Sequence, residues 1–215
     1  MDLEHLKRLA GIGEQNHNMK SLAQEMAERR RSIMQQVMKE QKEEQLELQS
    51  LPYKITDLAP VLSKENVDYH YDILSRGYVN RYNNKEGDPN FNYGGAKLHN
   101  LWWQQFKPAK ETSNYGGPIK QTIDANYGDL KGLEEKLVEA AMTIQGSGWV
   151  YLTKTGTIKT TPNQSYKPDV FMPIDMWEHS FTDYVPAKDA KVKYIKAVLK
   201  LIDWNAINRR LEGWT

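Results

Sequence analysis

Residues 170–179 read VFMPIDMWEH and combine an apolar run with two metal-binding side chains. The run that precedes Asp175 has the length and composition of a buried strand. A strand that ends at Asp175, followed by a turn that returns His179 beside it, would hold a carboxylate and an imidazole as two ligands of one metal ion. The same spacing also arises when a carboxylate pairs with a histidine at the start of a helix. On this stretch alone, both interpretations stay open.

Composition limits the classes of protein to which the chain can belong. It has 215 residues, a formal net charge of +1 and no cysteine. The absence of cysteine excludes a disulfide framework, a thiolate metal site and a cysteine nucleophile. The near-zero charge offers no broad attraction to nucleic acid or to an anionic membrane, so neither is expected as a partner. No apolar run approaches the ~20 residues of a membrane span, and the first residues lack the apolar core of a secretory signal. We therefore expect a cytoplasmic protein.

The first fifty residues differ from the rest, because every Phe, Trp and Tyr of the chain lies after residue 50. A segment without aromatic side chains cannot easily build its own core. Apolar residues nevertheless recur at helical spacing, which predicts a long helix over residues 18–48; they are Met19, Leu22, Met26, Ile33 and Val37. Residues 1–50 are thus a helical N-terminal extension. Two interpretations stay open: a solvated, partly disordered arm, or an arm that docks on a protein partner or on its own oligomer.

Residues 51–135 are predicted to form a helical hairpin domain in which two helices carry one histidine each. Ser63 is a suitable N-cap for the first helix, which carries His70 and Tyr78. Because helical side chains lean toward the N-terminus, Tyr78 can reach back toward whatever His70 binds. The second helix is expected after Gly94-Gly95, with His99 at the start of an apolar stripe. A third is expected over residues 130–144. Taken singly, each histidine is more often a core residue than a ligand.

Residues 136–215 are predicted to form a small α/β domain. Strands are expected at residues 149–152 and 157–160 and in the run before Asp175, and helices at residues 190–202 and 205–211. Strands that fall between helical stretches place the fold in the α+β class.

Five motifs, in order, resemble the iron/manganese superoxide dismutase family over about residues 51–212. They are LPY at 51–53, YHY at 69–71 with YVN at 78–80, FNYGG at 91–95 followed by His99, GSGW at 146–149, and DMWEH at 175–179. The resemblance implies an N-terminal helical hairpin domain joined to a C-terminal α/β domain with a small three-stranded antiparallel sheet. It also implies a homodimer or a higher homo-oligomer.

The resemblance further implies metal-dependent disproportionation of superoxide to dioxygen and hydrogen peroxide. The implied metal ligands are His70, His99, Asp175 and His179. Such a set of imidazoles and one carboxylate suits one Mn or Fe ion per chain better than Ca or Mg.

Five other residues are implied to serve the reaction from outside the ligand set. Gln164 resembles the glutamine that hydrogen-bonds the metal-bound solvent in manganese members, and the iron-type glutamine has no counterpart at residues 94–96, which favours manganese. Tyr78 resembles the gateway tyrosine of the proton network. Trp149 and Trp177 would form a dry wall. Glu178 resembles the glutamate that pairs with the ligand histidine of a second copy.

The chain departs from the family pattern at three places. Leu74 stands where the family usually has a histidine, and Thr182 where it often has a tyrosine that bridges to that histidine across the dimer. The basic residue that the family carries near its substrate funnel has no clear match around residues 185–188.

Two other functions stay open on the sequence. One is a structural or interaction protein, such as a virion component, that uses this fold with reduced or no activity. The other is a non-haem iron oxygenase, which is less favoured because three histidines leave one open metal position where an oxygenase needs more.

Overall fold

The computed structural model describes residues 2, 22, 24–33 and 45–213, and it divides the chain into two compact units, residues 1–45 and 46–215. In the first unit, residues 24–33 are helical, and Leu22, Met26 and Ile33 are exposed. Most of the remaining predicted arm helix lies outside the described residues. No helix among the described residues is long and apolar enough to cross a membrane.

The prediction that the arm helix continues to residue 48 is wrong, because residues 45–50 are not helical. Side chains of the following domain bind the backbone of residues 46–50, which we call the strap. Asn83 accepts from Leu46 N at 2.9 Å and donates to Leu46 O at 2.8 Å. Asn100 accepts from Gln49 N and donates to Glu47 O. These bonds replace those that a helix would make within itself.

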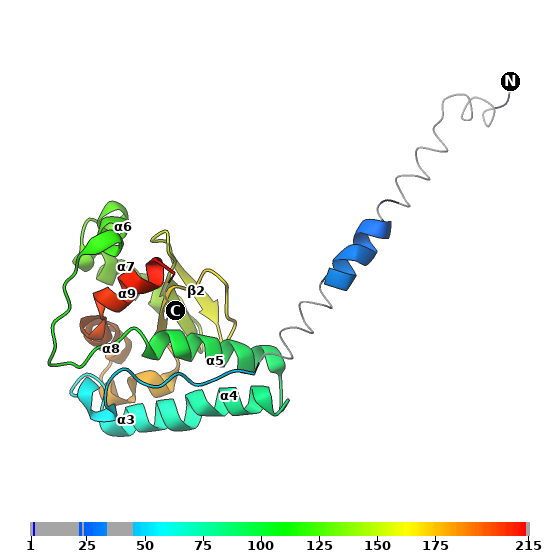
Figure 1. The fold of residues 1–215 in the computed structure, drawn as a ribbon. Coiled ribbons are helices and arrows are strands. Elements are labelled where there is room, and N and C mark those ends of the chain that lie inside the picture. The colour runs from blue at the N-terminus through cyan, green and yellow to red at the C-terminus, as the bar shows by residue number, and fades with distance from the viewer. Residues whose placement is uncertain (1, 3–21, 23, 34–44, 214–215) are drawn as a thin grey trace. The chain divides into compact units, whose positions relative to one another are not determined.

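The helical hairpin follows a short 3₁₀ helix, η1 (Ile55–Leu58). Its first arm is continuous through α3 (Lys64–Asp68), the π-helix η2 (Tyr69–Ser75) and α4 (Arg76–Asn83), and its second arm is α5 (Pro89–Trp103). The two arms lie side by side (Figure 1). The predicted cap is confirmed, since Ser63 accepts a hydrogen bond from Asn66 N at 3.1 Å.

Helix α5 begins earlier than the sequence predicts. It starts at Pro89 and not after Gly94-Gly95, because Asp88 caps it by accepting from Phe91 N at 2.9 Å. Proline suits the first helical position, where its missing N–H is not needed. The two glycines therefore lie inside the helix, where glycine costs stability unless something packs close to it.

The second half of the chain places helices around a three-stranded antiparallel sheet. In order its elements are α6 (Gly117–Tyr127), α7 (Leu130–Met142), β1 (Gly148–Leu152), β2 (Ile158–Pro162), β3 (Met172–Asp175), η3 (Glu178–Tyr184), α8 (Ala190–Val198), η4 (Leu199–Leu201) and α9 (Trp204–Leu211). The strand order is β2-β1-β3. The predicted α+β class, helical hairpin and small antiparallel sheet are confirmed. Helix α6 was not predicted; it buries only Ile119 and Ile123 of its own face.

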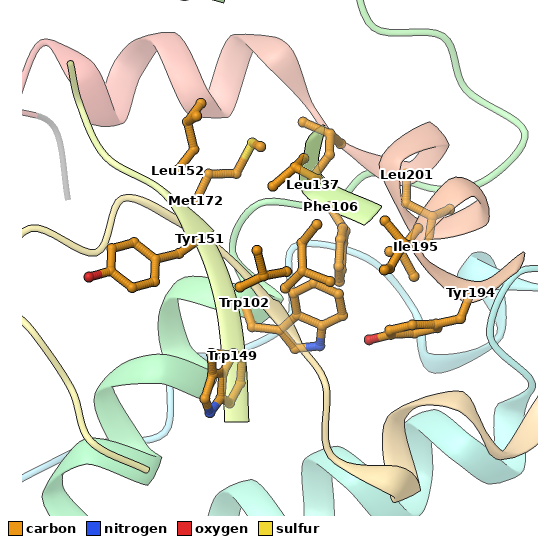
Figure 2. Close-up of a cluster of buried hydrophobic side chains, with 14 of the residues drawn as sticks. Trp102, Phe106, Leu137, Trp149, Tyr151, Leu152, Met172, Tyr194, Ile195 and Leu201 are labelled. Atoms are coloured by element: carbon orange, nitrogen blue, oxygen red, sulfur yellow. The ribbon is translucent and has the colours of Figure 1, made fainter. Parts of the chain in front are cut away.

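Strand β1 is the centre of the core and is buried at every position. In the sheet register, Trp149 lies opposite Asp175 of β3. Figure 2 shows Trp149 next to Trp102 of α5 at one end of the strand, and their ring centroids are 6.4 Å apart. This packing joins the hairpin to the sheet at the strand end where Asp175 lies.

Candidate metal centre

Four elements bring together the four side chains that the sequence singled out as ligands. His70 lies on η2, His99 on α5, Asp175 at the end of β3, and His179 in η3. The strand that ends at Asp175 is as predicted, and a short turn then leads into the 3₁₀ helix η3, so that His179 lies at a helix start. We call these four residues the His/Asp cluster. One potential ligand atom from each lies within 4.8 Å of all the others.

The cluster is arranged around the carboxylate. Oxygen Oδ2 of Asp175 lies 3.1 Å from His70 Nε2, 3.6 Å from His99 Nε2 and 3.4 Å from His179 Nε2. The side chains of His70, His99 and Asp175 are at most 1% exposed, and that of His179 is 16% exposed. The site is therefore dry on three sides and reaches solvent near His179.

These four atoms fit one metal ion. None of them has a hydrogen-bond partner of proper geometry among the described residues, although all are buried, and buried polar atoms are normally satisfied. Two ligand atoms about 2.1 Å from one ion, at angles of about 90–120°, lie roughly 3.0–3.6 Å apart, which the separations from Asp175 match. Three imidazoles and a carboxylate suit a transition metal.

Neighbouring groups hold three of the four candidate ligands in position. His99 Nδ1 lies 2.6 Å from Gly95 O, and because a carbonyl only accepts, Nδ1 carries the proton and Nε2 keeps its lone pair for a metal. Asp175 Oδ1 accepts from Trp177 N at 2.8 Å, which leaves Oδ2 for the cluster. On the π-helix that carries His70, Ser75 Oγ donates to His70 O at 2.7 Å. Such outer contacts orient metal ligands.

Burial keeps the rings in the form that binds metal. It lowers the pKa of His99 to about 3 and lowers the pKa of His70, although Asp175 opposes the shift at His70. Burial disfavours the charged form of Asp175, but the imidazoles of His179 and His70 outweigh it and hold the pKa of that carboxyl below its usual range. At neutral pH the cluster therefore offers an ionised carboxylate and neutral rings on His70 and His99.

A hydrogen-bonded chain of three residues lies beside the cluster. Trp149 Nε1 donates to Gln164 Oε1 at 3.0 Å, and Gln164 Nε2 donates to Tyr78 Oη at 3.1 Å. The Tyr78 and His99 rings are 5.2 Å apart. Burial raises the pKa of Tyr78, although the hydrogen bond from Gln164 opposes the shift, so the phenol keeps its proton at neutral pH.

The two glycines inside α5 allow this approach. A Cβ on Gly94 would lie 1.7 Å from Gln164 O, and a Cβ on Gly95 would lie 2.5 Å from Cγ of Tyr78. Such distances are far below normal contact, so no larger residue fits without displacing the chain or ring beyond it. Both glycines therefore set how close Gln164 and Tyr78 come to the His/Asp cluster.

Three aromatic rings lie beside the cluster, and one of them, Phe91, is exposed. Phe91, which is 37% exposed, lies 5.8 Å from the ring of Tyr78 and 6.2 Å from that of Trp177. The ring of Trp177 lies 5.9 Å from that of His179. We call Tyr78, Phe91 and Trp177 the aromatic rim. Glu178, beside it in sequence, is exposed.

Leu74 and Thr182, which depart from the family pattern, make no hydrogen bond with each other, and Thr182 is bound to Asn66. Leu74 is half-buried and, as a hydrocarbon, makes no hydrogen bond. Thr182 Oγ1 accepts from Asn66 Nδ2 at 2.9 Å, and the same amide donates to His179 O at 3.0 Å. Asn66 thus ties the segment that carries His179 to helix α3. Sequence reasoning missed Asn66, and its position three residues after the Ser63 cap gave no functional signal.

Two family models match the chain. The alpha-hairpin domain of the iron/manganese superoxide dismutases matches residues 45–89, and the C-terminal domain of the same enzymes matches residues 115–210.

Curated relatives agree with these matches. The chain is 32% identical to superoxide dismutase [Mn] 1, mitochondrial, of Arabidopsis thaliana, across 73% of this chain and 81% of that protein. It is 30% identical to superoxide dismutase [Mn/Fe] of Porphyromonas gingivalis, across 76% and 98%. It is 27% identical to superoxide dismutase [Fe] of Saccharolobus solfataricus, across 78% and 94%.

Proposed function

The chain belongs to the iron/manganese superoxide dismutase family, and we propose that it disproportionates superoxide at the His/Asp cluster. Family membership makes it an oxidoreductase whose cofactor is a Mn or Fe ion. The observation that supports the site is the convergence of four buried ligand atoms that lack hydrogen-bond partners among the described residues. His70, His99, Asp175 and His179 would hold one ion per chain.

The bound ion supplies one-electron redox chemistry, by which two superoxide anions and two protons become one dioxygen and one hydrogen peroxide. The protein's part is to supply protons and to limit water. The phenol of Tyr78, held by Gln164 Nε2 at 3.1 Å, is the protein proton donor beside the cluster. Its raised pKa keeps that proton available at neutral pH.

Tryptophans would form the dry wall. Trp149 is fully buried and its ring lies 5.1 Å from that of His99, while Trp177 covers His179. A dry, fixed surround strengthens electrostatic interactions at the metal. Trp149 also orients Gln164 by donating to its side-chain oxygen.

Manganese is the metal we favour over iron. Gln164 stands at the cluster with both ends of its amide hydrogen-bonded, to Trp149 and to Tyr78. Residues 94–96 of α5, where the resemblance would place an iron-type glutamine, are Gly94, Gly95 and Ala96, none of which carries a side-chain amide.

Assembly, location and domain limits belong to the same proposal. Glu178 is exposed in the single chain, as a residue that pairs with the ligand histidine of a second copy would be, and this supports a homodimer. The family's hydrogen bond across the dimer, between a histidine and a tyrosine, would be absent, because Leu74 and Thr182 stand at those two positions. Thr182 is bound instead to Asn66 of the same chain. We expect a cytoplasmic enzyme, with sequence-derived limits of 1–50 for the extension, 51–135 for the hairpin domain and 136–215 for the α/β domain. Two of these limits shift in the structure: residues 46–50 go with the hairpin, whose side chains bind their backbone, and helix α7 (Leu130–Met142) spans the limit at 135/136.

The comparisons do not favour the alternative of a structural protein without activity. Metal analysis and a superoxide assay on the purified chain test the proposal directly. We expect near-stoichiometric Mn or Fe and dismutation that depends on it. His99→Ala should lose metal, whereas His17→Ala, at a histidine outside the His/Asp cluster, should retain it. Unchanged metal content in His99→Ala would exclude His99 as a ligand, and zinc alone in the wild type would refute the assignment.

A further inference from the structure

We propose that Arg81 attracts the anionic substrate to the metal centre, as a fixed cation behind the aromatic rim. This inference rests on the proposed function, because it takes superoxide as the species that must approach. Its basis is the juxtaposition of Arg81, Tyr78, Asn92 and Gly77 on the hairpin.

The ring of Tyr78 lies between Arg81 and the His/Asp cluster. The guanidinium carbon Cζ of Arg81 is 5.0 Å from the centroid of the Tyr78 ring. That ring is in turn 5.2 Å from the ring of His99 and 5.8 Å from that of Phe91. The positive charge thus lies against the buried ring of the aromatic rim, the one that contacts both His99 and the exposed Phe91.

The guanidinium is held in this position from two sides. Arg81 Nε donates to Asn92 Oδ1 at 3.1 Å, and Asn92 Nδ2 donates to Glu86 O at 2.8 Å. Glu86 N in turn donates to Arg81 O at 2.8 Å, which closes a loop of contacts between the two arms of the hairpin. On the other side, Gly77 leaves the necessary space, since a Cβ there would lie 2.9 Å from Arg81 Nη1. An arginine so constrained is pre-organised.

The charge of Arg81 is not neutralised by a carboxylate. Within residues 45–213 it takes part in no ion pair, and its hydrogen-bond acceptor is a neutral amide. Arg76, on the same helix, provides the contrast: its Nη2 lies 2.6 Å from Asp72 Oδ1, and its guanidinium lies over Tyr71 and not over Tyr78. The helix therefore carries one paired arginine away from the rim and one unpaired arginine beside it.

An unpaired, half-buried cation behind the rim of a dry site attracts small anions. Opposite unit charges about 7 Å apart in water attract enough for roughly a threefold change in rate constant. The attraction is felt over about 30 Å at 0.01 M salt and over only about 3 Å at 1 M salt. Residues 185–188 offer no clear match for the basic residue that the family carries near its substrate funnel, and Arg81 supplies a positive charge beside the aromatic rim.

The test compares metal-loaded wild type with Arg81→Gln, Arg81→Lys and the matched control Arg76→Gln, all at equal metal content. First, kcat/KM for superoxide is measured by pulse radiolysis against ionic strength. Second, the dissociation constant of azide, a small anion that needs no turnover, is measured by absorption titration of the metal. We expect Arg81→Gln to lose about threefold in kcat/KM at low salt, to show a shallower salt dependence, and to bind azide about threefold more weakly. Arg81→Lys and Arg76→Gln should stay close to wild type.

Two results would overturn the inference: an Arg81→Gln protein with the salt dependence and azide affinity of the wild type, or an equal loss in Arg76→Gln. Failure of the proposed function is a separate outcome. If the metal-loaded wild type does not dismutate superoxide, the function is refuted, while the azide titration still decides whether Arg81 attracts anions.

Discussion

Replacing Gly94 by alanine would test whether the close approach of α5 to the Gln164 loop sets the metal centre. The added Cβ would lie 1.7 Å from Gln164 O and 2.9 Å from Gln164 C. Since non-bonded heavy atoms prefer separations of about 3.5 Å, the loop or the helix must move by roughly 1.5 Å or more. The Cβ is fixed to the helix backbone and the atoms that it meets belong to the backbone of Gln164, so neither side can turn aside as a flexible side chain would.

This displacement has a cost in stability and a cost in rate. Overpacking of this kind costs about 1–3 kcal/mol, and the better helix propensity of alanine offsets at most about 1 kcal/mol. For a domain of this size the higher figure lowers the unfolding temperature by roughly 6–12 °C. A misplacement of 1 Å at a reacting site can cost on the order of 100-fold in rate, and the position of Gln164 relative to α5, which carries His99, would change by more than that.

The assay is thermal unfolding, metal content and turnover of Gly94→Ala beside Asn90→Ala. Asn90 lies on the same helix and is exposed, so its replacement changes helix propensity without adding a contact. We expect the control to match the wild type. A Gly94→Ala protein with wild-type unfolding temperature and wild-type turnover at equal metal loading would refute the view that Gln164 is held by this contact.

Three further predictions concern the hydroxyl, the strap and the metal. Tyr78→Phe should slow turnover by about 10²–10⁴-fold with little loss of metal, because it removes the proton donor that Gln164 holds; equal turnover at equal loading would contradict the relay. Deleting residues 1–44 should leave unfolding and activity intact, whereas deleting residues 1–50 should lower the unfolding temperature, because Leu46 is buried against Tyr78; circular dichroism melts compare the two truncations. Removing the metal by chelation should reversibly lower the free energy of unfolding, by about 4 kcal/mol relative to protein with the ion at 1,000 times its dissociation constant. Calorimetry of apo and reloaded protein would show this as a lower unfolding temperature that reloading restores.

Local patterns in the sequence were enough for the fold class and for the elements that carry the candidate ligands. The apolar run before Asp175 is strand β3, Ser63 caps the helix that leads to His70, and the histidine of the second helix lies on α5. These features depend on spacing and capping within a few residues, which is information that a linear sequence contains. The resemblance to a known family rests on the same local motifs.

Contacts between distant residues decided the rest. Residues 46–50 are not helical, and Asn83 and Asn100 bind their backbone from 37 to 53 positions away. In the sequence, Gly94 and Gly95 indicate a helix boundary. In the structure they lie inside α5, where Gln164 and Tyr78 pack against them.

The placement of Arg81 over Tyr78 also belongs to the tertiary structure. It depends on an amide, Asn92, that the other arm of the hairpin supplies. Hydrogen-bond partners and packing distances of this kind come from how elements meet in space, and the spacing of residues along one element carries no record of them. The sequence by itself therefore determined which side chains could bind a metal, and only the folded chain determined what surrounds them.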